Sequence, residues 1–294
     1  MANGNLKMKL LGRGALLLMS IIWGSSFFIL KNTLESVSTL YVLAIRFSGA
    51  AVLLCLFSLR ELKKLDRRYL LGGALMGLCL LAAYVLQTYG LTLTTPGKNA
   101  FLTATYCVIA PFLGWLLLRR KPGGYNVLAA VVCIVGIGFV SLGSDFSINP
   151  GDALTLCCGL FYALHILVID RYAEGRSALL LTMVQFAVAG ALAWIAALLT
   201  EPVPKQIPPD AAISIVYLCV MCSALCNFLQ TFGQKYTPAA GTAILMTLES
   251  VFGALFSAIF YHERFSLKLL LGFALIFSAV LISETKLSFL RKKE

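Results

Sequence analysis

Long apolar stretches, separated by short polar breaks, run through the chain from end to end. Each stretch is about 18 to 24 residues long, which is the length that an α-helix needs to cross about 30 Å of hydrocarbon. The pattern therefore predicts an all-α, polytopic membrane protein. Ten transmembrane helices are expected, over residues 12–30, 37–58, 69–90, 97–118, 124–142, 152–170, 177–199, 211–233, 238–261 and 266–284.

The composition agrees with this pattern. Of the 294 residues, 60% are hydrophobic and 13% are charged, against about 25% charged in an ordinary soluble domain. The nine cysteines lie nearly all inside apolar stretches, so no disulfide framework is expected. A net charge of +11 is one feature of nucleic-acid binding, but here the basic residues sit in the breaks. We therefore expect membrane lipid around the chain and no nucleic-acid partner.

The basic residues in the breaks predict how the chain is oriented, because cytoplasmic loops carry an excess of Lys and Arg. With a cytoplasmic N-terminus, only five of them fall outside, namely Lys31, Lys98, Lys205, Arg264 and Lys268. Both termini are thus predicted to be cytoplasmic, with the chain in the cytoplasmic (plasma) membrane. The first stretch has no small-residue cleavage site and is followed by many more, so it is interpreted as a transmembrane helix and not as a signal peptide.

The two halves of the chain resemble each other. A shift of 139 positions pairs Trp23 with Tyr162 and Arg46 with Gln185, and a shift of 143 pairs Tyr106 with Glu249. The difference between the two shifts falls in the proline-rich break TEPVPKQIPPD. Because each half holds five spans, an odd number, the second copy must be inverted relative to the first. Two inverted repeats are predicted, over residues 1–145 and 146–294, and such repeats are typical of secondary transporters.

Several short motifs are similar to one known family. They are Trp23-Gly24-Ser25-Ser26-Phe27, Arg46-Phe47, Asn99-Ala100-Phe101-Leu102-Thr103 with Pro111, and Leu248-Glu249 through His262-Glu263. Over nearly its full length the chain resembles the EamA family of the drug/metabolite transporter superfamily. The resemblance implies ten helices in two inverted halves, and substrates such as amino acids, their derivatives or other polar metabolites, often with export as the direction.

Two charges lie deep in the apolar stretches. Glu249 is near the middle of the ninth stretch and Arg46 lies at a similar depth in the second. A charge at the centre of a bilayer costs at least about 2.5–3.5 kcal/mol, so each needs a partner or a role. Glu249 is a candidate for proton coupling or for binding a cationic substrate group, or it is a structural carboxylate. Arg46 has a structural role, pairs with Glu249 or binds a substrate carboxylate.

Other polar residues recur in matching helices of both halves. For each of them a hydrogen bond between helices is the simple alternative, but together they favour a polar central cavity. We predict a substrate site lined by Trp23, Ser26, Arg46, Tyr84, Gln87, Asn99, Thr103, Tyr106, Tyr162, His165, Gln185, Asn227, Gln230 and Glu249. His165 is a second candidate for proton coupling, since histidine titrates near neutral pH.

Three further motifs receive a structural interpretation. Cys219, Cys222 and Cys226 share one helical face, but no fourth ligand is nearby, so packing is preferred over a metal site. Gly73 and Gly77 have the spacing that lets helices approach closely, and internal packing is preferred over dimerisation. The stretch His262-Glu263-Arg264 is expected to be a solvated cap.

These observations favour a secondary transporter, and not an enzyme, that moves a small organic molecule across the membrane by alternating access. A membrane-embedded enzyme is the first alternative, but no span carries paired aspartates, a zinc motif or a serine with a base. A channel would need a ring of repeated ligands. No cofactor is expected. The sequence leaves the substrate, the direction of transport, the coupling ion and the oligomeric state open, a monomer included.

Overall fold

The computed structural model describes residues 2–119, 121–143, 147–173, 175–236 and 239–285. Within these ranges the chain forms a bundle of helices, and the only β contact is an isolated bridge between Leu142 and Ile148. The helices are α1 (Ala2–Thr33), α2 (Thr39–Ser58), η1 (Leu62–Lys64), α3 (Arg67–Leu93), α4 (Pro96–Thr103), α5 (Tyr106–Leu118), α6 (Gly124–Ser141), α7 (Pro150–Tyr172), α8 (Ala178–Thr200), α9 (Pro209–Tyr217), η2 (Leu218–Leu225), α10 (Cys226–Tyr236), α11 (Ala239–Phe260) and α12 (Leu267–Thr285).

Eight helical segments of the described chain are long and apolar enough to cross a membrane, and Leu245–Phe260 and Leu267–Ser283 are shorter apolar helices. The prediction of an all-helical polytopic protein is confirmed, while the count of ten spans stays a prediction. The predicted start of the ninth span at Pro238 and the predicted repeat boundary between 145 and 146 lie outside the described residues.

The outer surface of the bundle carries many large apolar side chains. Leu199 is 79% exposed, Leu116 75% and Phe57 73%. A soluble monomer rarely exposes apolar patches of this extent, whereas lipid solvates them well. The inner positions hold the aromatic pair Phe47 and Phe186, both fully buried. The distribution is that of a multi-pass membrane protein.

The predicted span 97–118 is interrupted at Ala104 and Thr105, where α4 ends and α5 begins. The Thr105 hydroxyl donates a hydrogen bond of 2.6 Å to the carbonyl of Leu102 and supports the turn. Further along α5, Pro111 has no N–H to offer the carbonyl of Cys107, one turn before it. That carbonyl accepts a hydrogen bond from the Ser283 hydroxyl of α12 at 3.4 Å.

The predicted span 211–233 is also irregular, because its middle part, η2, is a π-helix between α9 and α10. The Ser223 hydroxyl donates to the carbonyl of Leu218, five residues earlier, at 3.1 Å. Such π-helical segments are rare and are frequently found at functional sites.

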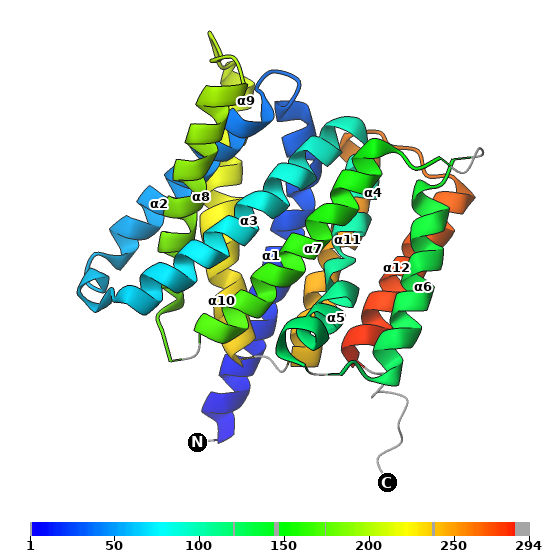
Figure 1. The fold of residues 1–294 in the computed structure, drawn as a ribbon, viewed down its shortest axis with the longest axis horizontal. Helices are drawn as coiled ribbons and strands as arrows, with labels where there is room; N and C mark the ends of the chain where they lie inside the picture. The colour runs from blue at the N-terminus through cyan, green and yellow to red at the C-terminus, as the bar shows by residue number, and fades with distance from the viewer. Residues whose placement is uncertain (1, 120, 144–146, 174, 237–238, 286–294) are drawn as a thin grey trace.

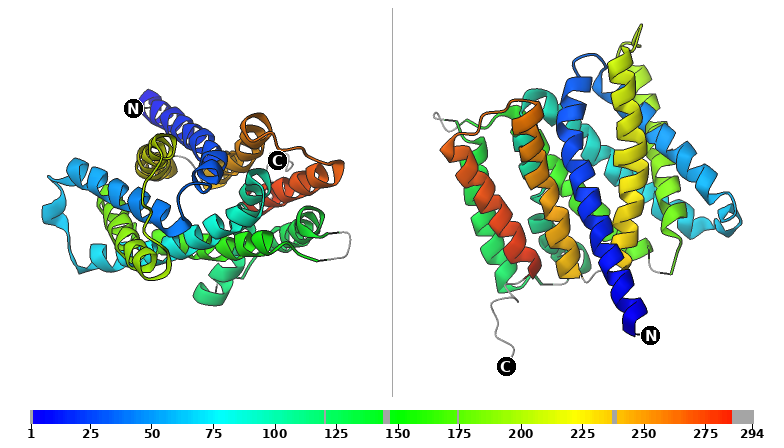
Figure 2. Two further views of the ribbon diagram at one scale, coloured as in Figure 1. Left: turned by 90° about the horizontal axis from the view of Figure 1, so that it is seen from above. Right: turned by 180° about the vertical axis from the view of Figure 1, so that it is seen from behind.

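Helices from distant parts of the chain lie side by side (Figures 1 and 2). In the bundle, α3 packs along α7 and α8, α2 along α8, and α1 along α11 and α10. The pair α6 and α12 forms one edge of the molecule. The N-terminal end of α1 and the C-terminal end of α12 lie on the same side of the bundle.

The close approach of α3 to α8 depends on two glycines. A Cβ atom at Gly73 would lie 2.5 Å from the Cβ of Val184, and one at Gly77 would lie 2.6 Å from the carbonyl oxygen of Gln185. Both positions therefore require glycine, and the internal packing expected from their spacing is confirmed.

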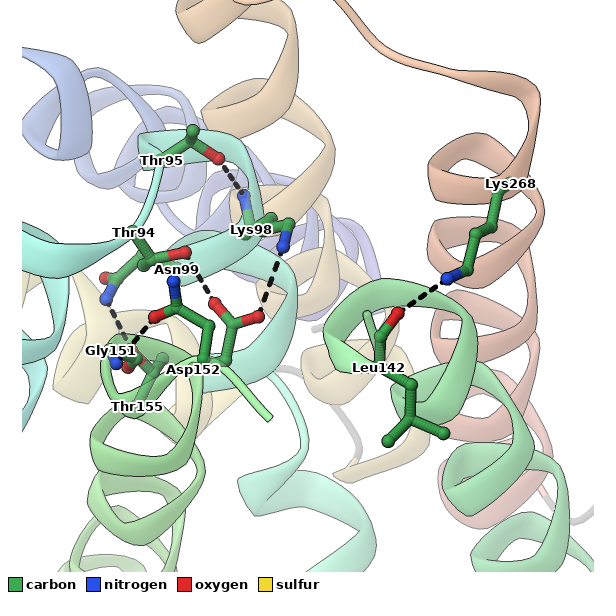
Figure 3. A network of polar contacts seen from close by, with 10 residues as sticks. Thr94, Thr95, Lys98, Asn99, Leu142, Gly151, Asp152, Thr155 and Lys268 are labelled. Carbon is green, nitrogen blue, oxygen red and sulfur yellow. Dashed lines mark hydrogen bonds and ion pairs between the residues drawn. The ribbon is translucent and has the colours of Figure 1, made fainter. Parts of the chain in front are cut away.

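Three lysines predicted to lie outside contact helix ends, and Figure 3 shows two of them, Lys98 and Lys268. Lys98 forms an ion pair of 3.2 Å with Asp152, which is fully buried and also accepts from the Thr94 hydroxyl at 2.5 Å. Lys268 donates to the carbonyl of Leu142 at the end of α6. Lys31 donates at 2.6 Å to the carbonyl of Leu91, near the end of α3. Cations such as Lys268 and Lys31 are favourable at the carbonyl-rich C-terminal ends of helices.

Two glutamates occupy helix N-termini, where unpaired N–H groups favour an anion. Glu201 accepts from the backbone N–H of Leu40, at the start of α2, at 3.0 Å. Glu263 accepts from the N–H of Gly97, at the start of α4, at 3.0 Å, and from the Ser257 hydroxyl. The expectation of a solvated cap at residues 262–264 is therefore wrong for Glu263, which is half-buried, although both its neighbours are exposed.

Candidate functional site

A cavity lies between helices of the two predicted halves. The first half of the chain lines it with residues of α1, α2, α3, α4 and α5, and the second half with residues of α7, α10 and α11. The free space in it, including its open part, is about 720 Å³. Its lining residues are Trp23, Ser26, Phe27, Leu30, Arg46, Leu80, Tyr84, Gln87, Asn99, Thr103, Tyr106, Tyr162, His165, Ile166, Asn227, Gln230, Met246 and Glu249.

The structure brings all but one of the fourteen predicted site residues to this cavity. The exception is Gln185, which is 1% exposed and lines a smaller cavity beside the first. There its side-chain carbonyl lies 2.7 Å from Nε2 of His165. His165 borders both cavities. Arg46, Tyr106 and Glu249 therefore share one cavity. Gln185, the predicted counterpart of Arg46 in the second half, lines the adjoining smaller cavity instead.

Arg46 enters the cavity from α2 with its side chain 1% exposed. Its Nε donates to the Ser223 hydroxyl of the π-helix at 2.6 Å, and its Nη2 donates to the Tyr84 hydroxyl at 3.3 Å. The guanidinium carbon lies 4.8 Å from the centre of the Tyr84 ring, a cation–π distance. In the described part of the chain, Nη1 has no hydrogen-bond partner. The guanidinium group is thus held through Nε and Nη2, while Nη1 is available to bind a ligand.

Glu249 enters the same cavity from α11. Among the residues that the structure describes, no side chain or backbone group donates a hydrogen bond to its carboxylate, and none forms an ion pair with it within 4.0 Å. Arg46 and Glu249 are thus in one cavity without being paired. A second small cavity connects Glu249 with Ala104 and Tyr106, at the interruption between α4 and α5. Broken helices of this kind surround the binding sites of many transporters.

A hydrogen-bonded network fixes one wall of the cavity. Gln87 of α3 donates to the Thr103 hydroxyl at 3.0 Å and accepts from the Tyr162 hydroxyl at 2.9 Å. Asn99 donates to the backbone carbonyl of Gln87 at 3.1 Å and to the Thr155 hydroxyl at 2.8 Å. These contacts join α3, α4 and α7, so the interhelical role that the sequence left open applies to this group. The Asn99 carbonyl oxygen is buried and has no hydrogen-bond partner among the described residues.

Aromatic rings form the adjoining surface. The ring centres of Tyr84 and Tyr162 are 5.7 Å apart, and those of Tyr106 and Tyr162 are 6.0 Å apart. Phe47 packs against Tyr84 from behind at 5.2 Å. Ring pairs at these separations add stabilisation beyond their buried area, so these contacts stabilise the wall.

Trp23 anchors α1 to the π-helix on the opposite wall. Its Nε1 donates at 2.6 Å to the carbonyl of Cys222, which the irregular η2 leaves available. Ser26 donates to the carbonyl of Trp23 within α1. The Cys222 and Cys226 thiols donate to carbonyls of α1, from Ile22 and Met19. This cysteine face packs against α1, and no three His, Cys, Asp or Glu side chains in the described ranges are grouped to hold a metal ion.

Sequence reasoning missed the apolar part of the lining. Leu80 lies one turn from Tyr84, Met246 lies three residues before Glu249, and Phe27 and Leu30 follow Ser26 on one helical face. The 3.6-residue period, applied outward from each predicted polar residue, would have found them. No sequence signal marked Ser223, which holds Arg46.

Comparisons with known proteins agree with this architecture. The EamA-like transporter family model matches residues 10–142 and again residues 149–285. An uncharacterized transporter of Archaeoglobus fulgidus is 32% identical over 268 residues, covering 91% of this chain and 83% of that protein. The uncharacterized inner membrane transporter YedA of Escherichia coli is 30% identical over 152 residues, 50% of this chain and 48% of that protein.

Two more distant matches cover nearly the whole chain. The protein PecM of Dickeya dadantii is 23% identical over 277 residues, 93% of this chain and 92% of that protein. A solved crystal structure aligns with a TM-score of 0.66 at 15% identity, covering 95% of this chain and 98% of the other. At this identity the crystal structure supports the fold alone. Because the family model matches both halves and the archaeal transporter aligns over 91% of the chain, this protein belongs to the EamA-like transporter family.

Proposed function

We propose that the chain is a secondary transporter that moves a small organic metabolite across the cytoplasmic membrane by alternating access. The observation that carries the proposal is the cavity between helices of both halves, lined by the unpaired Glu249 and the partly satisfied Arg46. An asymmetric polar molecule, such as an amino acid or a derivative, would offer a group to each charge. The direction we expect is export, with both chain termini in the cytoplasm.

The helix contacts support two inverted repeats of five helices, over residues 1–145 and 146–294. Exchanging the halves exchanges α1 with α7, and α3 with the span α9–η2–α10. The contact of α3 with α7 then corresponds to that of α10 with α1, and both occur. The same exchange replaces α2 by α8 and α6 by α12. The contacts α2–α8 and α6–α12 therefore each correspond to themselves, and both occur. In Figure 1, α1 and α7 run in opposite directions across the bundle, as inversion requires.

Alternating access would then move one half against the other around the cavity. The edge pair α6 and α12 contributes no residue to the cavity lining and would act as a brace. The interruptions at Ala104–Thr105 and in η2 lie in spans that line the cavity, where a change of backbone angle alters its shape.

The test begins with purified protein and a thermal-shift screen against amino acids, their derivatives and other polar metabolites. Hits are then followed by counterflow in proteoliposomes, with and without a pH gradient. Saturable counterflow is the expected result. Product formation would instead favour an enzyme, and conductance a channel.

The variant Arg46→Lys tests whether Arg46 itself belongs to the substrate site. Lysine keeps the positive charge but loses the planar fork that holds Ser223, Tyr84 and a ligand together. We expect counterflow to fall strongly, while Arg13→Lys, at an exposed position of α1, leaves it unchanged. Equal rates in both variants would remove Arg46 from the substrate site.

A further inference from the structure

An apolar groove opens on the flank of the bundle, away from the polar cavity. It lies between α2, α8, η2 and α10, and its free space, including the open part, is about 930 Å³. Phe57 and Phe228 are 73% and 47% exposed at its edge. The lining is apolar throughout: Leu53, Leu54, Phe57, Leu179, Val220, Ala224, Leu225 and Phe228. In a membrane-spanning bundle this groove faces lipid.

A small cavity adjoins the groove on its inner side. Leu54, Leu179 and Phe228 also line this small cavity, which reaches Ala178 and Thr182 on α8. Thr182 is 6% exposed, and its hydroxyl has no hydrogen-bond partner among the described residues. Its position on the wall of a void means that an entering polar group could bind to it.

The same Thr182 lines the next small cavity, together with Gln185. That cavity shares His165, Asn227 and Gln230 with the polar central cavity. Shared lining residues thus place two small voids in a row between the lipid-facing groove and the cavity of Arg46 and Glu249. The lining changes along the way from wholly apolar to hydrogen-bonding.

Helix packing explains why the gap lies here. On one side α8 packs along α2, and on another along α3, where Gly73 and Gly77 bring the backbones together. By contrast α8 touches α10 only slightly. The small side chain of Ala178 leaves the seam between α8 and α10 open at this level. The seam lies at the start of α8 and the end of α2, on the side of the bundle where α1 begins.

We propose that the central cavity has a second entrance, from the lipid bilayer, through the seam between α8 and α10. The molecules it admits are small amphipaths, with an apolar tail that fits the groove and a hydrogen-bonding head that passes Thr182 and Gln185. Their onward transport rests on the proposed function, but entry to the cavity does not depend on it.

Entry is measured with Trp23 as a reporter inside the cavity. Trp115→Phe and Trp194→Phe remove the other tryptophans. The protein is placed in liposomes, and the probe is 4-decanoylamino-TEMPO, an amphipath whose nitroxide head quenches tryptophan on contact. Acrylamide, a water-soluble quencher, reports the aqueous opening. The test variant is Thr182→Phe, which fills the neck, and the matched control is Thr200→Phe, at an exposed position of the same helix.

We expect the membrane-dissolved probe to quench Trp23 in the parent protein and in Thr200→Phe, and this quenching to be lost in Thr182→Phe. Acrylamide quenching should be the same in all three. A phospholipid brominated on its acyl chain is too large for the neck and should not quench Trp23. Probe quenching that survives Thr182→Phe, or that is lost together with acrylamide quenching, would overturn the proposal.

A replacement variant and the counterflow assay separate the possible outcomes. If circular dichroism shows that Thr182→Phe does not fold, Ala178→Leu narrows the same neck and takes its place. If counterflow finds no transport while the quenching pattern holds, the proposed function fails and the entrance stands. If counterflow shows transport and the probe does not quench Trp23 in the parent protein, the proposed entrance is rejected and the proposed function is kept.

Discussion

The Nε atom of Arg46 donates a hydrogen bond of 2.6 Å to the hydroxyl of Ser223, and this contact ties α2 to the π-helix η2. The arginine is 1% exposed and the serine is fully buried. A serine inside a π-helix thus orients the one cation that reaches the central cavity from within a described span.

Ser223→Ala should therefore lower the free energy of unfolding by about 1–3 kcal/mol, because a buried charged donor loses its acceptor. The measurement is thermal unfolding of the purified protein in detergent micelles. Ser36→Ala, at an exposed position, should stay within about 0.5 kcal/mol of the parent. Equal melting temperatures for the two variants would show that the contact contributes nothing to stability.

Glu249→Gln should act in opposite directions on stability and on transport. Glutamine removes a carboxylate that has no ion-pair or hydrogen-bond partner among the described residues, so we expect the substrate-free protein to gain about 1 kcal/mol of unfolding free energy. Flux driven by a pH gradient should be lost. Glu35→Gln, at an exposed position, is the control and should change neither. Intact proton-driven flux in Glu249→Gln would refute a coupling role.

The ion pair of Asp152 with Lys98 offers a comparison of buried and exposed charges. Asp152→Ala leaves Lys98 and Thr94 without their acceptor, and we expect a loss of about 2 kcal/mol. The estimate is below that for a fully buried pair because the Lys98 side chain is 25% exposed. Glu61→Ala breaks the exposed pair with Lys64, 3.9 Å apart, and should cost at most about 1 kcal/mol.

These two variants are compared by thermal unfolding under one set of conditions. An Asp152→Ala loss no larger than that of Glu61→Ala would mean that the network in Figure 3 is compensated by solvent.

Gly73→Ala should destabilise the protein, because the new methyl group would collide with Val184 of α8. Overpacking of this kind typically costs about 1–3 kcal/mol. Gly14→Ala is the matched control, since a Cβ there meets no atom within 4 Å, and helix propensity predicts a gain of up to about 1 kcal/mol. Melting temperatures that shift in the same direction for both would contradict the packing of α3 against α8.

Much of this architecture could be predicted from the sequence, because lipid imposes a length and a polarity on every span. Polar residues such as Gln87 and Glu249 stood out against their apolar neighbours, and the structure places them at one cavity. Apolar lining residues such as Leu80 could not stand out in the same way. Whether those polar groups bind a substrate stays a prediction.

The irregular backbone could not be predicted for a different reason. The turn at Ala104–Thr105 contains neither proline nor glycine, and the π-helix begins at Leu218 without any residue that ends an α-helix. The π-helix has partners that are distant in sequence, Trp23 and Arg46, which no local pattern reveals. The orientation of Gln185 toward His165 likewise depends on how α7 and α8 both pack along α3.

The π-helix also makes the eighth predicted span shorter than an α-helix of the same number of residues would be. Its wider turns hold more residues along the same distance than an α-helix does. If η2 rewound into α-helical turns, the span would lengthen, and the carbonyl of Cys222 would lose its availability to Trp23. Such rewinding would increase the distance between α9 and α10 along the helix axis. Rewinding of the eight residues of η2 would therefore lengthen the transmembrane segment between α9 and α10 without any change in its sequence.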